Sequence, residues 1–209
     1  MFIELNDWAS ARNSPSGTLP FISLPSGNRI SDSTRCFQYV LDTKNVTDID
    51  GALTEEERAS AVAYKVWPED WVYFLMLWDR FIDNWYYTRE GLVAGALPFY
   101  PIRVVLFKVL YRRYTTTLRN KGIIRKPREE IVATIAEAVQ TMSVLVGEKG
   151  MFDGKPCSVS AFLFGILVCM YEWPKLNKAW TVELAKYPDL RSWTEGMVTR
   201  YYPEREFRN

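Results

Sequence analysis

Two short motifs near the start of the chain combine residue types that can bind a charged ligand. Leu19-Pro20 leads into the apolar run "PFISL" at 20–24, and Asp32-Ser33 leads into a segment whose apolar residues have helical spacing. The first turn of a helix offers free backbone amides and the positive end of the helix dipole, so together with the Ser33 hydroxyl it can hold a carboxylate. Asp32 can receive an ammonium group. The alternative is structural: Leu-Pro starts a strand, and Asp-Ser caps a helix.

The composition excludes several kinds of active site. The chain has no histidine among its 209 residues, which excludes a Ser-His-Asp triad, a Cys-His pair and the commonest zinc sites. Acid–base chemistry near neutral pH would depend on carboxylates, lysine, tyrosine or cysteine in perturbing surroundings. We therefore expect no metal. The 26 Lys and Arg residues against 25 Asp and Glu give a net charge of +1, which does not support nucleic-acid binding.

Cysteine usage and apolar runs bear on where the protein works. Cys36, Cys157 and Cys169 are an odd number of cysteines without a close pairing motif, which favours a reducing compartment over a disulfide framework. The longest apolar run, at 161–171, is about half the length that a membrane span requires. The first residues lack a basic segment followed by an apolar core, the pattern of a signal peptide. We expect a cytoplasmic protein without a membrane span.

The pattern of residue types predicts a short β-rich part followed by helices. Strands are expected at 2–5 and in a hairpin in which Pro25-Ser26-Gly27 separates "PFISL" from "NRIS" at 28–31. A helix is predicted over 32–42. From Thr54 onward everything is helical, beginning with a Thr54/Glu57 capping box. Proline and glycine residues bound the later helices, which we predict at 101–119, 127–147, 157–172, 177–186 and 189–201.

An aromatic stripe marks one face of the first long helix. Its members recur at steps of 4, 3, 4, 3 and 4 residues: Trp67, Trp71, Phe74, Trp78, Phe81 and Trp85. Pro68 interrupts this stripe and should kink the helix or start a second segment. The stripe can pack into the core, or it can line an apolar substrate pocket. Our candidate pocket residues are Tyr73, Trp78, Phe81 and Trp85.

A basic stretch follows the stripe. Between Glu90 and Glu129 the chain has no acidic residue and nine basic ones. With "PIRVVLFKVLY" at 101–111 this is a basic amphipathic segment, which can touch an anionic membrane surface or attract a substrate that carries a carboxylate. The alternative is an ordinary solvated helix face.

The whole chain resembles the glutathione transferase superfamily, and more closely its failed-axon-connections and metaxin-like branch. The resemblance implies an α+β, mostly α fold: a partial thioredoxin-like domain over 1–45, a linker at 46–53 and an all-helical C-terminal domain over 54–209. The segments that carry it are "SPSGTLPFISLPSGNRISDST" at 14–34, "LTEEERA" at 53–59, "RNKGIIRKPREEI" at 119–131, "FDGKPCSVSAFLFG" at 152–165 and "YPDLRSWTEGMVTRYYP" at 187–203.

The resemblance also implies a glutathione site. The backbone of Leu19 before a cis Pro20 would bind the cysteinyl amide, and Asp32 and Ser33 would bind the γ-glutamyl end. The thiol-activating residue of the family stands on a first strand that precedes "FIEL" at 2–5, and this sequence begins at that second strand. The catalytic residue is therefore unknown. The gap in the sheet implies a truncated product, a remnant that repacks, or a partner chain or homodimer that fills the edge.

The start of one predicted helix differs from the family pattern. Cys157 and Ser160 stand where the family has a Ser/Thr helix cap and an aspartate, which predicts a weaker cap or a cap at Ser158.

The sequence leaves two functions open. One is a glutathione transferase-like enzyme that acts on an apolar or aromatic small molecule by thiol addition, isomerisation or elimination, with or without glutathione. The other is a non-catalytic, metaxin-like adaptor.

Overall fold

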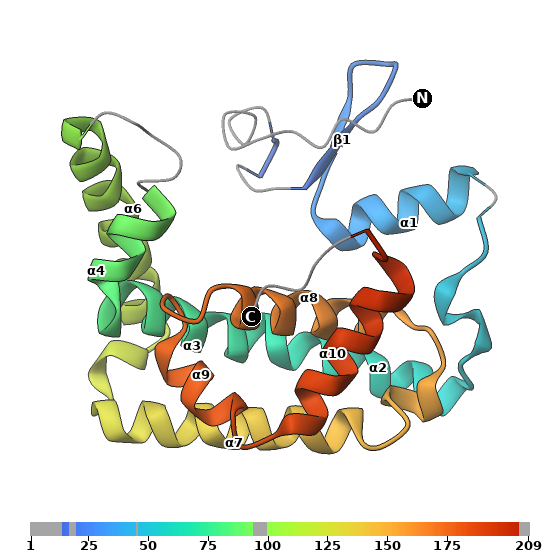
Figure 1. Cartoon of the computed structure of the whole chain (residues 1–209). Coiled ribbons are helices and arrows are strands. Elements are labelled where there is room, and N and C mark those ends of the chain that lie inside the picture. The colour runs from blue at the N-terminus through green and yellow to red at the C-terminus, as the bar shows by residue number, and fades with distance from the viewer. Residues whose placement is uncertain (1–13, 17–19, 45, 94–99, 205–209) are drawn as a thin grey trace. The chain divides into compact units, whose positions relative to one another are not determined.

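The computed structural model describes residues 14–16, 20–44, 46–93 and 100–204. It divides the chain into two compact units, Met1–Gly51 and Ala52–Asn209. In its described residues the first unit has two strands and a helix, and the second is built from helices (Figure 1). The predicted fold class, a short β-containing part followed by an all-helical part, is confirmed. The strand expected at 2–5 lies outside the described residues.

The first unit contains the predicted hairpin. Strands β1 (Phe21–Ser23) and β2 (Arg29–Ser31) pair antiparallel, with Phe21 opposite Ser31 and Ser23 opposite Arg29. Gly27 closes the turn with φ at 84° and donates its amide to the Leu24 carbonyl over 2.9 Å. Glycine suits this position because it adopts positive φ without a steric cost. Residues 24–28, which include the predicted Pro25-Ser26-Gly27, therefore connect the two strands.

Helix α1 (Ser33–Lys44) follows β2 after one residue and packs on both strands. Phe21, Ile22 and Cys36 are buried in this unit. The Cys36 thiol donates a hydrogen bond to the Ile30 carbonyl over 3.4 Å, which fixes the helix against β2. A 3-10 turn, Ile49–Ala52, comes next in the chain.

The second unit begins with the predicted capping box. The Thr54 hydroxyl accepts from the Glu57 amide over 3.2 Å, and the Glu57 carboxylate accepts from the Thr54 amide over 2.8 Å. Helix α2 (Glu55–Trp67) then runs to Pro68. Instead of breaking the chain's path, Pro68 opens a π-helical segment, η3 (Pro68–Val72). The wider π turn keeps the backbone helical at a residue that lacks an amide donor.

The aromatic stripe continues through alternating α and π segments. These are α3 (Tyr73–Trp78), η4 (Asp79–Asp83), α4 (Trp85–Tyr87) and η5 (Thr88–Val93). Asn84, with φ at −115° and ψ at 31°, interrupts the helical backbone between η4 and α4. The sequence periodicity predicts one face of a helix but does not reveal these π turns.

The later helices confirm the predicted positions within three residues at each end. They are α6 (Tyr100–Asn120), α7 (Arg128–Val146), α8 (Ser158–Glu172), α9 (Lys178–Leu184) and α10 (Pro188–Tyr201), with short 3-10 turns at Ile123–Arg125 and Met151–Gly154. Helix α7 packs against α9 and α10, and α2 packs against α8 (Figure 1). Their shared core includes the fully buried Ile135, Leu167 and Trp180.

None of the described helices combines the length and the apolar character that crossing a membrane requires.

Candidate functional site

The hairpin register brings two of the predicted ligand motifs to one end of the first unit. Because Phe21 pairs with Ser31, the flanking residues Pro20 and Asp32 lie at the same end of the two strands. Ser33 is the first residue of α1, so the Asp-Ser pair stands at a helix N-terminus, as predicted. Leu19, the other predicted ligand residue, lies outside the described residues. Pro20, Asp32 and Ser33 are all exposed to solvent.

Asp32 has an unusual backbone conformation. Its φ is 83°, and Phe152 and Asp153 are the other non-glycine residues with positive φ in the described part of the chain. One carboxylate oxygen of Asp32 accepts from the amides of Thr34 over 2.9 Å and Arg35 over 3.3 Å. Asp32 therefore caps α1, and two amides of the first turn already have an acceptor. Aspartate tolerates this region better than most residues because its short side chain bonds locally.

The stripe residues proposed for a substrate pocket separate into two groups. Trp78 and Phe81 are each 4% exposed and belong to the core. Trp85 is 43% exposed, and Tyr73 is 41% exposed. Partial burial raises the pKa of Tyr73, and the charges of Arg113 and Arg80 oppose this shift. Most of the stripe thus stabilises the helical unit, and only part of it meets solvent.

Trp85 forms a pocket with residues of α6. The pocket has a volume of about 310 Å³ and is lined by Trp85, Phe107, Lys108 and Tyr111. The ring centroids of Trp85 and Phe107 are 6.2 Å apart, and those of Phe107 and Tyr111 are 5.9 Å apart. Phe81 supports this wall from the core, since its ring lies 6.5 Å from that of Phe107. Among the residues that the structure describes, the lining is aromatic apart from the Lys108 ammonium group.

Sequence reasoning did not assign the α6 side of this pocket. Phe107 and Tyr111 stand four residues apart on the basic amphipathic segment, a spacing that places both on one helix face. That spacing is the signal that could have found them. Arg89 lies beside the pocket, with its guanidinium 5.5 Å from the Trp85 ring centroid and 5.2 Å from that of Tyr86.

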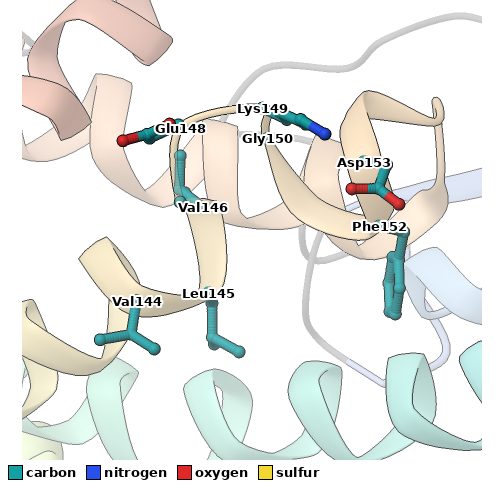
Figure 2. A pocket seen from close by; sticks show the side chains of 9 residues that line it. Val144, Leu145, Val146, Glu148, Lys149, Gly150, Phe152 and Asp153 are labelled. Atoms are coloured by element: carbon teal, nitrogen blue, oxygen red, sulfur yellow. The ribbon is translucent and has the colours of Figure 1, made fainter.

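A second hollow follows α7, where the chain turns back toward α8. It measures about 520 Å³ and is lined by residues from Val144 to Asp153. Figure 2 shows the charged side chains of Glu148, Lys149 and Asp153 along the loop, with Phe152 pointing away from it. Phe152 stacks on Tyr64 at 6.1 Å. The loop's backbone shapes this hollow, and its charged side chains do not converge on one point, so we assign it no chemistry.

A buried polar cluster joins η4 to the start of α9. Asp79 is fully buried; one carboxylate oxygen accepts from the Asn84 side chain over 2.5 Å, and the other accepts from the Ala179 amide over 3.1 Å. Arg80 donates to the Asn177 side chain over 2.8 Å. Burial raises the pKa of Asp79 to about 7, and the backbone amides of Trp180 and Ala179 oppose that shift. The cluster lies at a helix junction, away from the lining of both hollows.

The cysteines have structural surroundings. Burial raises the pKa of Cys36, which makes its thiol less reactive. Cys157 is the residue before α8, where no side chain caps the helix, and its sulfur lies 2.9 Å from the Ser160 hydroxyl. The Cys169 sulfur accepts from Arg80 over 3.1 Å. Among the described residues, no cluster of acids and cysteines is placed to hold a metal ion.

Two comparisons with known proteins bear on this arrangement. Residues 3–86 match the family model of the glutathione S-transferase N-terminal domain. Over 199 residues the chain is 27% identical to a metaxin-1 homolog of Caenorhabditis briggsae, an alignment that covers 91% of this chain. Both matches support the glutathione transferase superfamily for this chain. The second match supports its metaxin-like branch.

Two further findings describe how far the similarity extends. The chain spans 61% of the length of the metaxin-1 homolog that it matches. No solved structure matches it significantly. The match to the N-terminal domain model fits the short β-containing part of the chain and the helical unit that follows it.

Proposed function

We propose that this glutathione transferase-like chain binds glutathione at the hairpin end of its first unit and acts on an apolar or aromatic small molecule. The observation that carries the proposal is the strand register: Pro20 and Asp32 flank the same end of the hairpin, and Ser33 begins α1. The positive φ of Asp32 supports it, because unusual backbone conformations of non-glycine residues cluster at ligand sites.

The donor set at the hairpin end suits the charged end of glutathione. The Ser33 hydroxyl and the positive end of the α1 dipole favour a carboxylate. The exposed Asp32 carboxylate, which already accepts from the Thr34 and Arg35 amides, favours an ammonium group. Glutathione would supply the thiol nucleophile. The chain's own residues would orient the bound ligand, and the reaction would be thiol addition, isomerisation or elimination. No residue is proposed as the catalytic base, and a glutathione-independent reaction is the variant of this proposal.

The aromatic pocket of the second unit would take the apolar substrate. Trp85, Phe107 and Tyr111 offer ring faces and edges to a flat apolar group, and Lys108 would pair with a negative substituent. Tyr73 and Trp78 do not line this recess, and Phe81 would act on it through Phe107.

Glutathione binding is tested by titration calorimetry on the full chain and on Asp32→Asn. Asparagine keeps a side-chain oxygen for the Thr34 amide and tolerates positive φ, so α1 should stay capped. It removes the charge opposite the ligand's ammonium. We expect binding to weaken roughly ten-fold or more, the usual effect of losing a charge-assisted hydrogen bond.

Asp48→Asn is the matched control for this test. Asp48 lies in the same unit and accepts the amide of Asp50 over 2.9 Å, much as Asp32 accepts that of Thr34. Its substitution should leave glutathione binding unchanged. The proposal fails if the folded chain gives no saturable heat with millimolar glutathione, or if Asp32→Asn and Asp48→Asn bind equally.

The second candidate function is a non-catalytic, metaxin-like adaptor, and the alignment with the metaxin-1 homolog favours it. A partner chain or a second copy would add a strand to the β1–β2 sheet, since an unpaired strand edge accepts such pairing. Loss of glutathione binding in Asp32→Asn would leave this partner binding intact. Sedimentation of the full chain tests the homodimer. The free cysteines support a reducing compartment, and we propose a cytoplasmic location.

A further inference from the structure

Helix α6 exposes an apolar ridge to solvent. Ile102, Val105 and Val109 are 51%, 62% and 59% exposed, and their spacing of three and four residues places them on one face. The opposite face holds Phe107 and Leu118, which are 6% and 0% exposed and belong to the core. Figure 1 shows α6 at an outer edge of the helical unit, beside α4. The ridge is therefore a surface feature, separate from the aromatic pocket.

The same face continues into positive charge. Arg112 and Arg113 follow Val109 by three and four residues, and both are exposed. The sequence from 91 to 128 contains no acidic residue, so α6 has no carboxylate that could neutralise them. In the described parts of the chain, neither arginine forms an ion pair with another element. The face thus combines an apolar half toward the start of α6 with a basic half toward its end.

We propose that this face of α6 binds an anionic lipid surface. Ile102, Val105 and Val109 would enter the boundary between headgroups and acyl chains, while Arg112 and Arg113 would contact lipid phosphates. Peripheral helices that bind membranes combine buried apolar area with attraction to anionic lipid in this way. This binding is independent of glutathione at the hairpin end.

A second copy of the chain fits the face less well than anionic lipid does. In a symmetric pair the same patch meets itself, so the arginines of each copy would lie against the other copy's arginines or its apolar ridge. No acidic residue on either α6 could pair with them. A lipid surface supplies negative charge to pair with the arginines and an apolar layer to cover the ridge.

Vesicle co-sedimentation of the full chain tests the proposal, with phosphatidylcholine vesicles compared with vesicles of phosphatidylcholine and phosphatidylserine. We expect binding to the mixed vesicles alone, weakening as salt is added. Arg112→Gln combined with Arg113→Gln should weaken it roughly 25-fold, since each basic residue at such a surface contributes about a factor of five. Val105→Ser combined with Val109→Ser should weaken it roughly ten-fold.

A matched control variant and the oligomeric state of the chain distinguish lipid binding from the alternatives. Lys149→Gln combined with Arg200→Gln removes the same charge from exposed positions outside α6 and should leave vesicle binding within two-fold of the unsubstituted chain, roughly the spread of such measurements. Equal loss in both double variants would overturn the proposal, because net charge alone would then explain binding. It is also overturned if the folded chain ignores the mixed vesicles, or if it sediments as a dimer that Val105→Ser with Val109→Ser dissociates.

Discussion

Asp79→Ala is expected to destabilise the helical unit by about 3 kcal/mol, whereas Asp79→Asn should preserve the fold. Alanine would leave the Ala179 amide and the Asn84 side chain without their acceptor inside the protein. Asparagine has the shape of aspartate, and one of its atoms can still accept from Ala179. If the side-chain amide of Asn84 rotates by half a turn, its oxygen can accept from the side-chain nitrogen of the substituted asparagine. The two variants therefore separate lost hydrogen bonding from lost charge.

The charge of Asp79 makes this site sensitive to pH. Its pKa rises from 3.8 to about 7 on folding, chiefly through burial, and the neighbouring Asp83 adds to the rise. Between these values the folded chain holds a proton that the unfolded chain has released. The contribution of Asp79 to the free energy of unfolding should therefore fall as pH rises from about 4 to about 7, and stay level above that. A rise of about three in the pKa corresponds to a fall in the free energy of unfolding of about 4 kcal/mol at most.

Chemical denaturation of the unsubstituted chain and Asp79→Asn across this pH range measures the effect. Other groups titrate in both proteins, so the informative quantity is the difference in their free energies of unfolding. That difference should favour Asp79→Asn increasingly as pH rises toward 7. Asp70→Asn is the control, because Asp70 is exposed and lies 3.4 Å from Lys121. A difference that does not change with pH would mean that Asp79 is ionised in the folded protein throughout.

Local patterns in the sequence predicted the parts of this fold that are local in the chain. The Thr54/Glu57 box joins residues three positions apart, and the hairpin turn at Gly27 joins strands separated by five residues. Such features depend on neighbouring side chains and backbone conformation alone. The helix ends near Pro127 and Pro188 were predictable for the same reason.

Features that depend on distant residues were not predictable from one sequence. Asp79 contacts Ala179, 100 residues later, and nothing near Asp79 in the sequence marks it as buried. The pocket at Trp85 exists because α6 folds back to place Phe107 and Tyr111 beside it. The stripe could be core or pocket wall, and only its packing partners separate Trp78 from Trp85. At the hairpin end, the sequence located Asp32 at a helix start but not its positive φ.

Gly154→Ala should cause the other large loss of stability, about 3 kcal/mol or more. Gly154 has φ at 78°, which costs an L-residue about 1 kcal/mol. A Cβ there would also lie 2.7 Å from the Lys149 carbonyl oxygen, a backbone atom that cannot move without moving the loop. Gly122 has the same φ of 78° but open space around it, so Gly122→Ala should show the conformational cost alone. The difference between their free energies of unfolding isolates the clash.

Displacement of this loop would also affect the start of α2. Lys155, the residue after Gly154, places its ammonium 2.8 Å from the Glu57 carboxylate of the capping box. That contact, with the Thr54 amide, holds the pKa of Glu57 below its usual value. In Gly154→Ala the pKa of Glu57 should therefore rise toward 4.5, as measured by nuclear magnetic resonance, while in Gly122→Ala it should not move. The prediction is wrong if Gly154→Ala lowers the free energy of unfolding no more than Gly122→Ala does and leaves the pKa of Glu57 unchanged. The loop would then accommodate the added methyl group, and the left-handed turn would not position Lys155.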